Sequence, residues 1–167
     1  MSINLYQVSI PMLIHSLNTL STLLEKAEQH AEERRLDPQQ LLGARLYEDM
    51  FPLTGQIQRA SDTAKATASR LSGVTAPVFA DEEASFDELQ ARINKTIVFL
   101  EAIPADAING QEERPVIMKL RGEERTMTAQ QYLTSFGLPN FLFHVTTAYA
   151  ILRNQGVKLG KLDFLGL

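Results

Sequence analysis

The strongest constraint on the fold is a nearly uninterrupted apolar segment near the end of the chain. Residues 139–155 read PNFLFHVTTAYAILRNQ, with proline at the start and Gly156 directly after the segment. Proline is tolerated in the first turn of a helix, and glycine commonly follows the last turn. A helix that is apolar on almost every side must be covered by other elements. The segment therefore predicts a core helix inside a larger helical domain.

Three further helices are predicted from apolar residues that recur at intervals of three and four. The first begins near Pro11, and the third follows Ser85, which forms a capping-box pattern with Glu88. The second ends at Gly73 and contains Pro52, which lacks a backbone donor and predicts a kink or a break. The three apolar stripes are Leu13, Leu17, Leu20, Leu24, Ala27 and Ala31; Leu42, Leu46, Met50, Leu53, Ile57, Ala60, Ala64, Ala68 and Leu71; and Phe86, Leu89, Ile93, Ile97 and Leu100.

The pattern changes before the last helix. Residues 116–127 favour a small β-hairpin or an irregular excursion. Thr128 and Gln131 then form a second capping-box pattern, followed by a short helix that ends near Gly137. We therefore expect residues 1–167 to form one all-α domain, a four-helix bundle with a small hairpin or irregular insertion before the last helix.

Composition excludes several classes of function. The chain has no cysteine, which removes disulfides, thiolate metal sites and a cysteine nucleophile. Its net charge of −4 argues against nucleic-acid binding, which relies on clustered lysine and arginine. No apolar run approaches the roughly 20 residues that span a bilayer, and the N-terminus does not resemble a signal peptide. We expect a cytoplasmic protein with no nucleic-acid or membrane partner.

The last helix carries three candidate site residues, His144, Tyr149 and Arg153. A rotation of 100° per residue places His144 at the edge of the apolar face and Tyr149 on the opposite flank. His144 is either a neutral core histidine hydrogen-bonded to a neighbouring helix or a ligand or general base. Arg153 is expected to contact Asp163 in the C-terminal tail, the alternative being an anionic ligand.

Asp49 and Gln56 are two further candidates on the second helix. They lie seven residues apart, so a continuous helix would place them on one flank, with Thr63 and Thr67 further along. This polar strip either sets the register of the helices through hydrogen bonds or forms the wall of a small polar pocket that faces His144.

A metal site lacks the usual histidine spacing. Two histidines one helical turn apart are the common signal, but position 148 is alanine. His15 and His30 both lie on the first helix. We therefore predict no cofactor; the alternative is a divalent metal, for which His144 is the weak candidate ligand, in a mixed site with Asp49 and Gln56. No phosphate loop, G-x-S-x-G elbow or paired-carboxylate motif is present.

Three long segments of the chain resemble one uncharacterised family. They are PNFLFHVTTAYAILRNQGVKLGKLDFLG, ARLYEDMFPLTGQIQRASDTAKATASRLSG and DEEASFDELQARINKTIVFL, and the family is the domain of unknown function DUF1993. That family is similar to the DinB/YfiT-like putative metalloenzyme superfamily of four-helix bundles with an up-down-down-up arrangement. Classical members of that superfamily hold a divalent metal with three histidines, one on the second helix and two on the fourth, and some transfer or isomerise substrates with low-molecular-weight thiols.

The resemblance implies that His144 corresponds to a ligand on the fourth helix. Its partner one turn later is replaced by Ala148, and the second helix offers Gln56 or Asp49 in place of a histidine. The resemblance therefore supports the predicted fold more strongly than it supports a metal site or thiol chemistry.

Three functions stay open, and the sequence leaves undecided whether the protein is an enzyme. The first is a DinB-like bundle protein that binds a small molecule in a cavity near the last helix, beside His144, Tyr149, Asp49 and Gln56. The second is a divalent-metal-dependent transferase or hydrolase with an altered histidine centre. The third is a structural dimeric scaffold without catalysis. Because Phe143 and Ala150 lie on the outer face of the last helix, we expect a homodimer that covers them.

Overall fold

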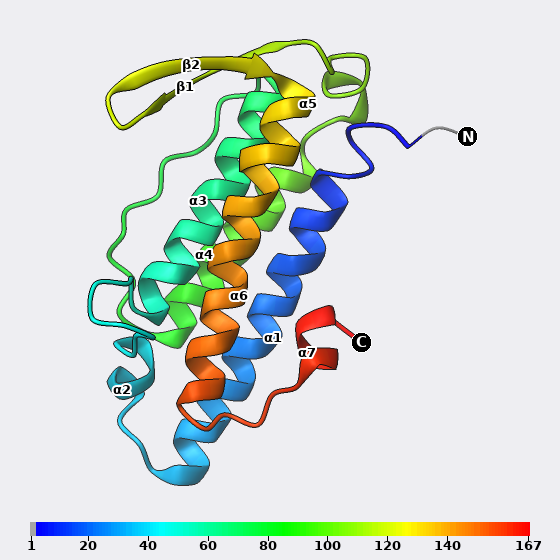
Figure 1. Cartoon of the computed structure of the whole chain (residues 1–167). Coiled ribbons are helices and arrows are strands. Elements are labelled where there is room, and N and C mark those ends of the chain that lie inside the picture. Colours follow the sequence, from blue (N-terminus) through cyan, green and yellow to red (C-terminus); the bar gives the residue numbers. More distant parts are fainter. Residues whose placement is uncertain (1–2) are drawn as a thin grey trace.

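The computed structural model describes residues 3–167 and consists mainly of helices (Figure 1). Four helices are long: α1 (Ile10–Arg34), α3 (Leu53–Ser72), α4 (Phe86–Glu101) and α6 (Leu138–Asn154). The shorter elements are α2 (Pro38–Leu42), a 3₁₀ turn (Ala105–Ala107), β1 (Pro115–Leu120), β2 (Glu123–Thr128), α5 (Ala129–Tyr132), a π-helical turn (Leu133–Gly137) and α7 (Lys161–Leu165).

The four long helices lie side by side, and two consecutive ones point the same way. In Figure 1, α1 runs down, α3 and α4 both run up, and α6 runs down. Each of α1 and α3 packs against both α4 and α6. Because α3 and α4 are parallel, the chain must return along their whole length before α4 can begin. Residues 73–85 make this return, and we call them the crossover segment.

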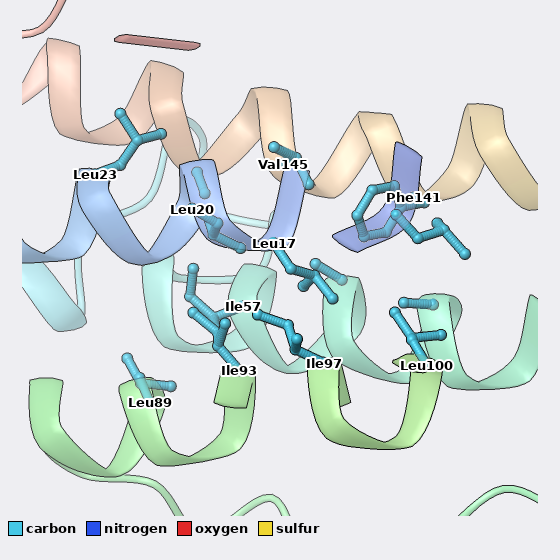
Figure 2. Close-up of a cluster of buried hydrophobic side chains, with 14 of the residues drawn as sticks. Leu17, Leu20, Leu23, Ile57, Leu89, Ile93, Ile97, Leu100, Phe141 and Val145 are labelled. Atoms are coloured by element: carbon cyan, nitrogen blue, oxygen red, sulfur yellow. The ribbon is translucent and has the colours of Figure 1, made fainter. Parts of the chain in front are cut away.

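The core lies between these helices and contains the predicted apolar stripes (Figure 2). The stripe on α1 is almost fully buried, as is the stripe on α4. The part of the second stripe that follows Pro52 is buried as well. Side chains from all four long helices meet there: Leu17 and Leu20 from α1, Ile57 from α3, Ile93 and Leu100 from α4, and Phe141 and Val145 from α6. Hydrophobic periodicity therefore predicted which face of each helix is buried.

The prediction for the first half of the second helix, before Pro52, is wrong. Helix α2 ends at Leu42, and residues 43–52 form an irregular loop in which Leu46 is exposed. The loop closes on itself, because the Leu53 N–H donates to the carbonyl of Ala44 at 2.9 Å and the Arg45 side chain donates to the carbonyl of Met50. Pro52 breaks the helix, as its missing donor predicted, and α3 starts immediately after it.

The hairpin before the last helix is confirmed. Strands β1 and β2 pair antiparallel, with Val116 opposite Met127, and Thr128 and Gln131 form the predicted capping box. The helix does not end near Gly137, however. It continues through the π-helical turn into α6, so Pro139 lies where the regular hydrogen-bond spacing is already interrupted. Gly137 packs closely on α3, because a Cβ there would lie 3.1 Å from Thr67 Oγ1, closer than an ordinary van der Waals contact.

The predicted contact between Arg153 and Asp163 is wrong. Arg153 donates to the carbonyl of Val157 at 3.0 Å, at the C-terminal end of α6. Asp163 instead pairs with Lys26 of α1 and accepts a hydrogen bond of 2.7 Å from the Gly160 N–H. The reason is the course of the tail, which turns back so that α7 packs on α1 (Figure 1).

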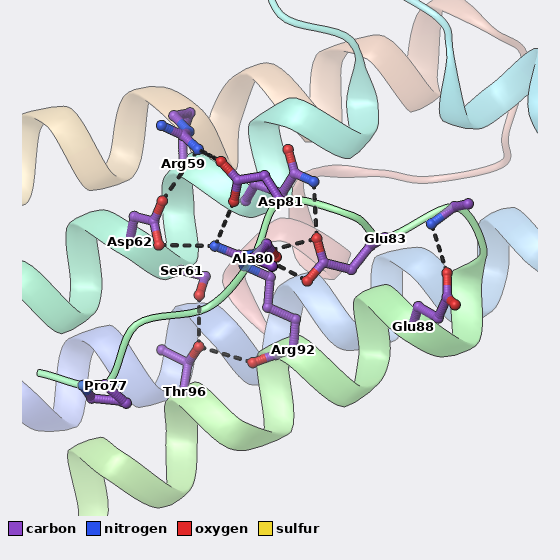
Figure 3. A network of polar contacts seen from close by, with 12 residues as sticks. Arg59, Ser61, Asp62, Pro77, Ala80, Asp81, Glu83, Glu88, Arg92 and Thr96 are labelled. Atoms are coloured by element: carbon purple, nitrogen blue, oxygen red, sulfur yellow. Dashed lines mark hydrogen bonds and ion pairs between the residues drawn. The ribbon is translucent and has the colours of Figure 1, made fainter.

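A cluster of ion pairs holds the crossover segment on α3 and α4 (Figure 3). At its centre is Arg92 of α4, whose side chain is only 1% exposed. Its guanidinium contacts Asp62 of α3 at 2.8 Å and, in the crossover segment, Asp81 at 3.0 Å and Glu83 at 2.9 Å. Burial alone would raise the pKa of Glu83, but hydrogen bonds from Gln58 and Arg92 lower it. The carboxylate therefore stays ionised beside Arg92.

Within residues 3–167, no helix combines the length and the apolar character that crossing a membrane requires.

We predict that Arg92→Ala lowers the free energy of unfolding by about 3 kcal/mol. The substitution removes the one cation shared by three carboxylates, and breaking a buried ion pair costs about 3–5 kcal/mol, less where the partners are partly exposed. Urea denaturation followed by circular dichroism measures the change. Lys95→Ala, at an exposed position on the same helix, is the control and should stay within about 0.5 kcal/mol of the wild type. A loss below about 1 kcal/mol for Arg92→Ala would contradict the central role of this residue.

Candidate functional site

The structure brings together two of the five predicted site residues. His144 on α6 and Gln56 on α3 are both buried, and His144 Nδ1 lies 2.8 Å from Gln56 Oε1. Asp49 lies in the exposed loop before α3, so it does not share a flank with Gln56. Tyr149 packs edge-to-face against Phe164 in the tail, at 5.5 Å between ring centroids. Arg153 is exposed at the end of α6. Asp49, Tyr149 and Arg153 therefore do not line the space around His144.

The hydrogen bonds of Gln56 determine the tautomer of His144. The Gln56 side-chain amide donates to the carbonyl of Phe51 at 3.1 Å, which leaves its oxygen to face the imidazole. An amide oxygen only accepts, so Nδ1 of His144 carries the proton and donates to it. In the neutral ring, Nε2 therefore presents an unshared electron pair.

The imidazole of His144 is neutral at physiological pH. Burial, and then the nearby charge of Arg59, lower the pKa of His144 from 6.5 to about 4. Of the residues described, none bonds Nε2, and the one buried side-chain nitrogen or oxygen without a partner is Nε of Arg92. Nε2 is therefore reachable from outside the protein. A hydrogen-bond acceptor that is neutral at physiological pH faces a groove at this point.

The groove lies between α3 and the continuous helix formed by α5, the π-helical turn and α6. It has a volume of about 260 Å³. Its lining consists of two arginines, two aromatic rings and several small or polar side chains: Arg59, Asp62, Thr63, Ala66, Arg70, Tyr132, Phe136, Asn140 and His144. Thr63, which belongs to the predicted polar strip, accepts a hydrogen bond of 3.1 Å from Asn140.

Most of these lining residues were missed by the sequence analysis. A signal was present, since Tyr132, Phe136, Asn140 and His144 recur every four residues, the spacing of one helical face. The predicted break near Gly137 hid this pattern because it assigned these residues to two separate helices. On α3, the half-buried Arg59 and the exposed Arg70 gave no sign in the sequence that they share a groove with His144.

The charges around the groove are unevenly neutralised. Arg59, Lys65 and Arg92 face three carboxylates: Asp62, Asp81 and Glu83. Arg70 is different, because among residues 3–167 no carboxylate lies within ion-pair distance of it. Its guanidinium lies over the ring of Tyr132, 5.4 Å from the centroid, and donates to the Tyr132 hydroxyl at 3.1 Å. Its other donors are free to bind an anion.

The residues around His144 do not fit a divalent metal. No group of three or more metal-ligating side chains occurs within the described part of the chain. Gln56 offers only an amide oxygen, which already accepts from His144, and Asp62 is paired with three cations. The charge of Arg59, which lowers the pKa of His144, also repels a metal cation. One imidazole nitrogen beside two arginines is a poor metal site.

A larger hollow of about 350 Å³ lies between the crossover segment and α4. Arg92 lies on its wall, but this guanidinium is already committed to Asp62, Asp81 and Glu83. The hollow therefore belongs to the cluster that holds the crossover segment, and the groove at His144 is the better candidate for a binding site.

Comparisons with known proteins agree on one family. The family model described as a domain of unknown function (DUF1993) matches residues 5–165. The crystal structure of a DinB family member protein from Shewanella denitrificans is similar, with a TM-score of 0.92 and 36% sequence identity over 98% of this chain and 92% of that chain. None of the curated proteins matches. Both similarities extend over α3 and α6, and thus over the groove.

We predict that Arg59→Gln raises the pKa of His144 above its wild-type value of about 4. The substitution removes a positive charge that opposes protonation of the imidazole. An NMR pH titration of the His144 ring measures the change, with Arg34→Gln, far from the groove, as the control. An unchanged pKa in Arg59→Gln would contradict the electrostatic coupling of the two residues.

The same shift predicts the pH dependence of stability. The pKa of His144 is lower in the folded chain than in the unfolded one, so the unfolded chain binds more protons between about pH 6.5 and about pH 4. Stability should therefore fall as the pH drops across this window, and the fall should be shallower in Arg59→Gln.

Proposed function

The chain belongs to the DUF1993 family, and from that premise we propose that it is a DinB-like protein that binds a small molecule in the groove between α3 and α6. The carrying observation is His144, an 8% exposed, neutral imidazole whose Nδ1 is held by Gln56 while Nε2 stays unbonded at the groove. Because Nε2 is not fully buried, solvent reaches it in the free protein, and a ligand that donates a hydrogen bond can take the place of that water.

The chemistry of His144 favours binding over catalysis. A general base works best when its pKa lies near the working pH. An imidazole with a pKa of about 4 gains little by taking a proton from a hydroxyl group or from water. Its charge also changes little across physiological pH, which suits a fixed hydrogen-bond acceptor. The alternative, a metal-dependent transferase or hydrolase, would require ligands that the groove does not supply.

We also propose that the long helices form the up-down-down-up bundle of DinB-like proteins. The directions of α1, α3, α4 and α6 in Figure 1 support this arrangement. So does the structural similarity to the DinB family member from Shewanella denitrificans. In such a bundle, the groove lies between the second and fourth long helices, which contain Gln56 and His144 respectively.

A homodimer is part of the proposal. Phe143, next to His144 on α6, is 53% exposed, and Ala150 on the same outer face is half-buried. We expect light scattering at micromolar concentration to give twice the mass of one chain, and Phe143→Asp to give the monomer mass, because a charge at a dimer interface is strongly unfavourable. A monomer mass for the wild type would refute the dimer and leave the groove unaffected.

The experiment that tests the groove is an NMR screen of a metabolite library against wild-type protein and Ala66→Phe. Ala66 lines the groove, so a phenyl ring there should fill it. We expect compounds that shift the His144 and Tyr132 signals of the wild type to have no effect on Ala66→Phe.

Asn94→Phe, on the exposed face of α4, is the matched control and should bind as the wild type does. Two results would overturn the proposal: no compound that shifts these signals, or a full equivalent of a transition metal in protein purified without chelators.

A further inference from the structure

Arg70 indicates which charge the ligand carries. Among the residues described, it is the groove cation without a carboxylate partner, whereas Arg59 contacts both Asp62 and Asp81. One of its nitrogens donates to the Tyr132 hydroxyl, which orients the guanidinium and leaves further donors unused. An oriented guanidinium with free donors matches the two oxygens of a carboxylate.

The middle of the groove indicates an apolar body. Tyr132 and Phe136 lie one helical turn apart, with ring centroids separated by 5.9 Å, and Ala66 faces them from α3. These side chains contribute an aromatic wall and a small opposite wall. A flat or narrow hydrocarbon group would bury apolar surface between them.

The other end of the groove indicates an uncharged donor. His144 Nε2 accepts a hydrogen bond and, being neutral, does not select for a charge. Arg59, the cation at this end, is already paired with Asp62 and Asp81, so this end offers no unpaired cation for a second anionic group. A hydroxyl group meets both conditions.

The separation of the two ends indicates an elongated molecule. Arg59, beside His144, and Arg70, beside Tyr132, are eleven residues apart on α3, which is about 16 Å along a helix axis. The groove has a volume of about 260 Å³. This volume lies below the roughly 300–1,000 Å³ typical of sites for drug-sized ligands.

We propose that the ligand is a small, elongated monocarboxylic acid with a hydroxyl group at its far end. Its carboxylate binds Arg70, its apolar body lies against Tyr132 and Phe136, and its hydroxyl donates to His144 Nε2. This inference rests on the proposed function, because it assumes that the groove is a binding site.

Three related probes test the inference without any substitution. They are para-hydroxyphenylpropionate, its methyl ester, which removes the charge, and phenylpropionate, which removes the donor. Titrations followed by NMR of the Arg70 and His144 side chains should give the tightest binding for the hydroxy acid. Loss of a charge-assisted contact should weaken the ester about tenfold or more. Phenylpropionate should bind less tightly and should no longer shift the His144 signals. An ester that binds as tightly as the acid would overturn the inference.

Two variants assign the charge to one residue. Arg70→Gln should weaken the hydroxy acid about tenfold or more while leaving the ester unaffected. Arg34→Gln, an exposed arginine in the last turn of α1, should bind as the wild type does. Equal binding of the acid by Arg70→Gln and the wild type would overturn the inference, and melting temperatures report whether each variant is folded.

The inference and the proposed function fail in different ways. Neutral or basic library compounds could shift the His144 signals in the wild type but not in Ala66→Phe, while the acids leave these signals unchanged in both proteins. In that case the proposed function stands and the proposed ligand class is wrong. If no compound of any class shifts these signals, both are wrong.

Discussion

The position of the crossover segment on α3 and α4 depends on the ion pairs around Arg92. Parallel α3 and α4 require a long return of the chain, and none of residues 73–85 is fully buried, so burial alone does not hold them in place. Asp81 and Glu83 of this segment meet a guanidinium that is almost completely buried, and Asp62 of α3 meets it from the other side. A buried ion pair adds little net stability compared with an apolar core, but its geometry is specific. Its role here is to set the position of the crossover segment relative to the two helices.

The same cluster also sets the distribution of charge along the groove. Asp62 and Arg59 belong to both, since they take part in the ion pairs and also line the groove. Their mutual neutralisation leaves Arg70 as the uncompensated cation of the groove, and the remaining field of Arg59 helps to keep His144 neutral. A neutral acceptor at one end and a free guanidinium at the other therefore follow from how the neighbouring charges are paired.

Local patterns predicted the helices well and the site only in part. Apolar periodicity identified the buried faces of α1, α3 and α4, and the capping residues Ser85 and Thr128 marked real helix starts, because these signals act between residues close in sequence. The loop before α3 was not predicted, because its apolar residues follow the spacing of a helix. In the structure, its backbone hydrogen bonds close a loop instead. The continuity of α5 and α6 was also missed, because a π-helical turn accommodates Gly137 and Pro139 without ending the helix.

The sequence alone determined that the chain is largely helical, that the last long helix lies in the core and that His144 lies at the edge of that core. These properties depend on the order of apolar and polar residues along a helix, which can be read directly. Tertiary structure decided which polar residues meet. It paired His144 with Gln56 and separated it from Asp49, Tyr149 and Arg153. It also brought Arg59 and Arg70 beside the helix that carries His144. Those contacts join residues 62 to 88 positions apart, and their geometry depends on the packing of α3 against α6, which no local pattern encodes.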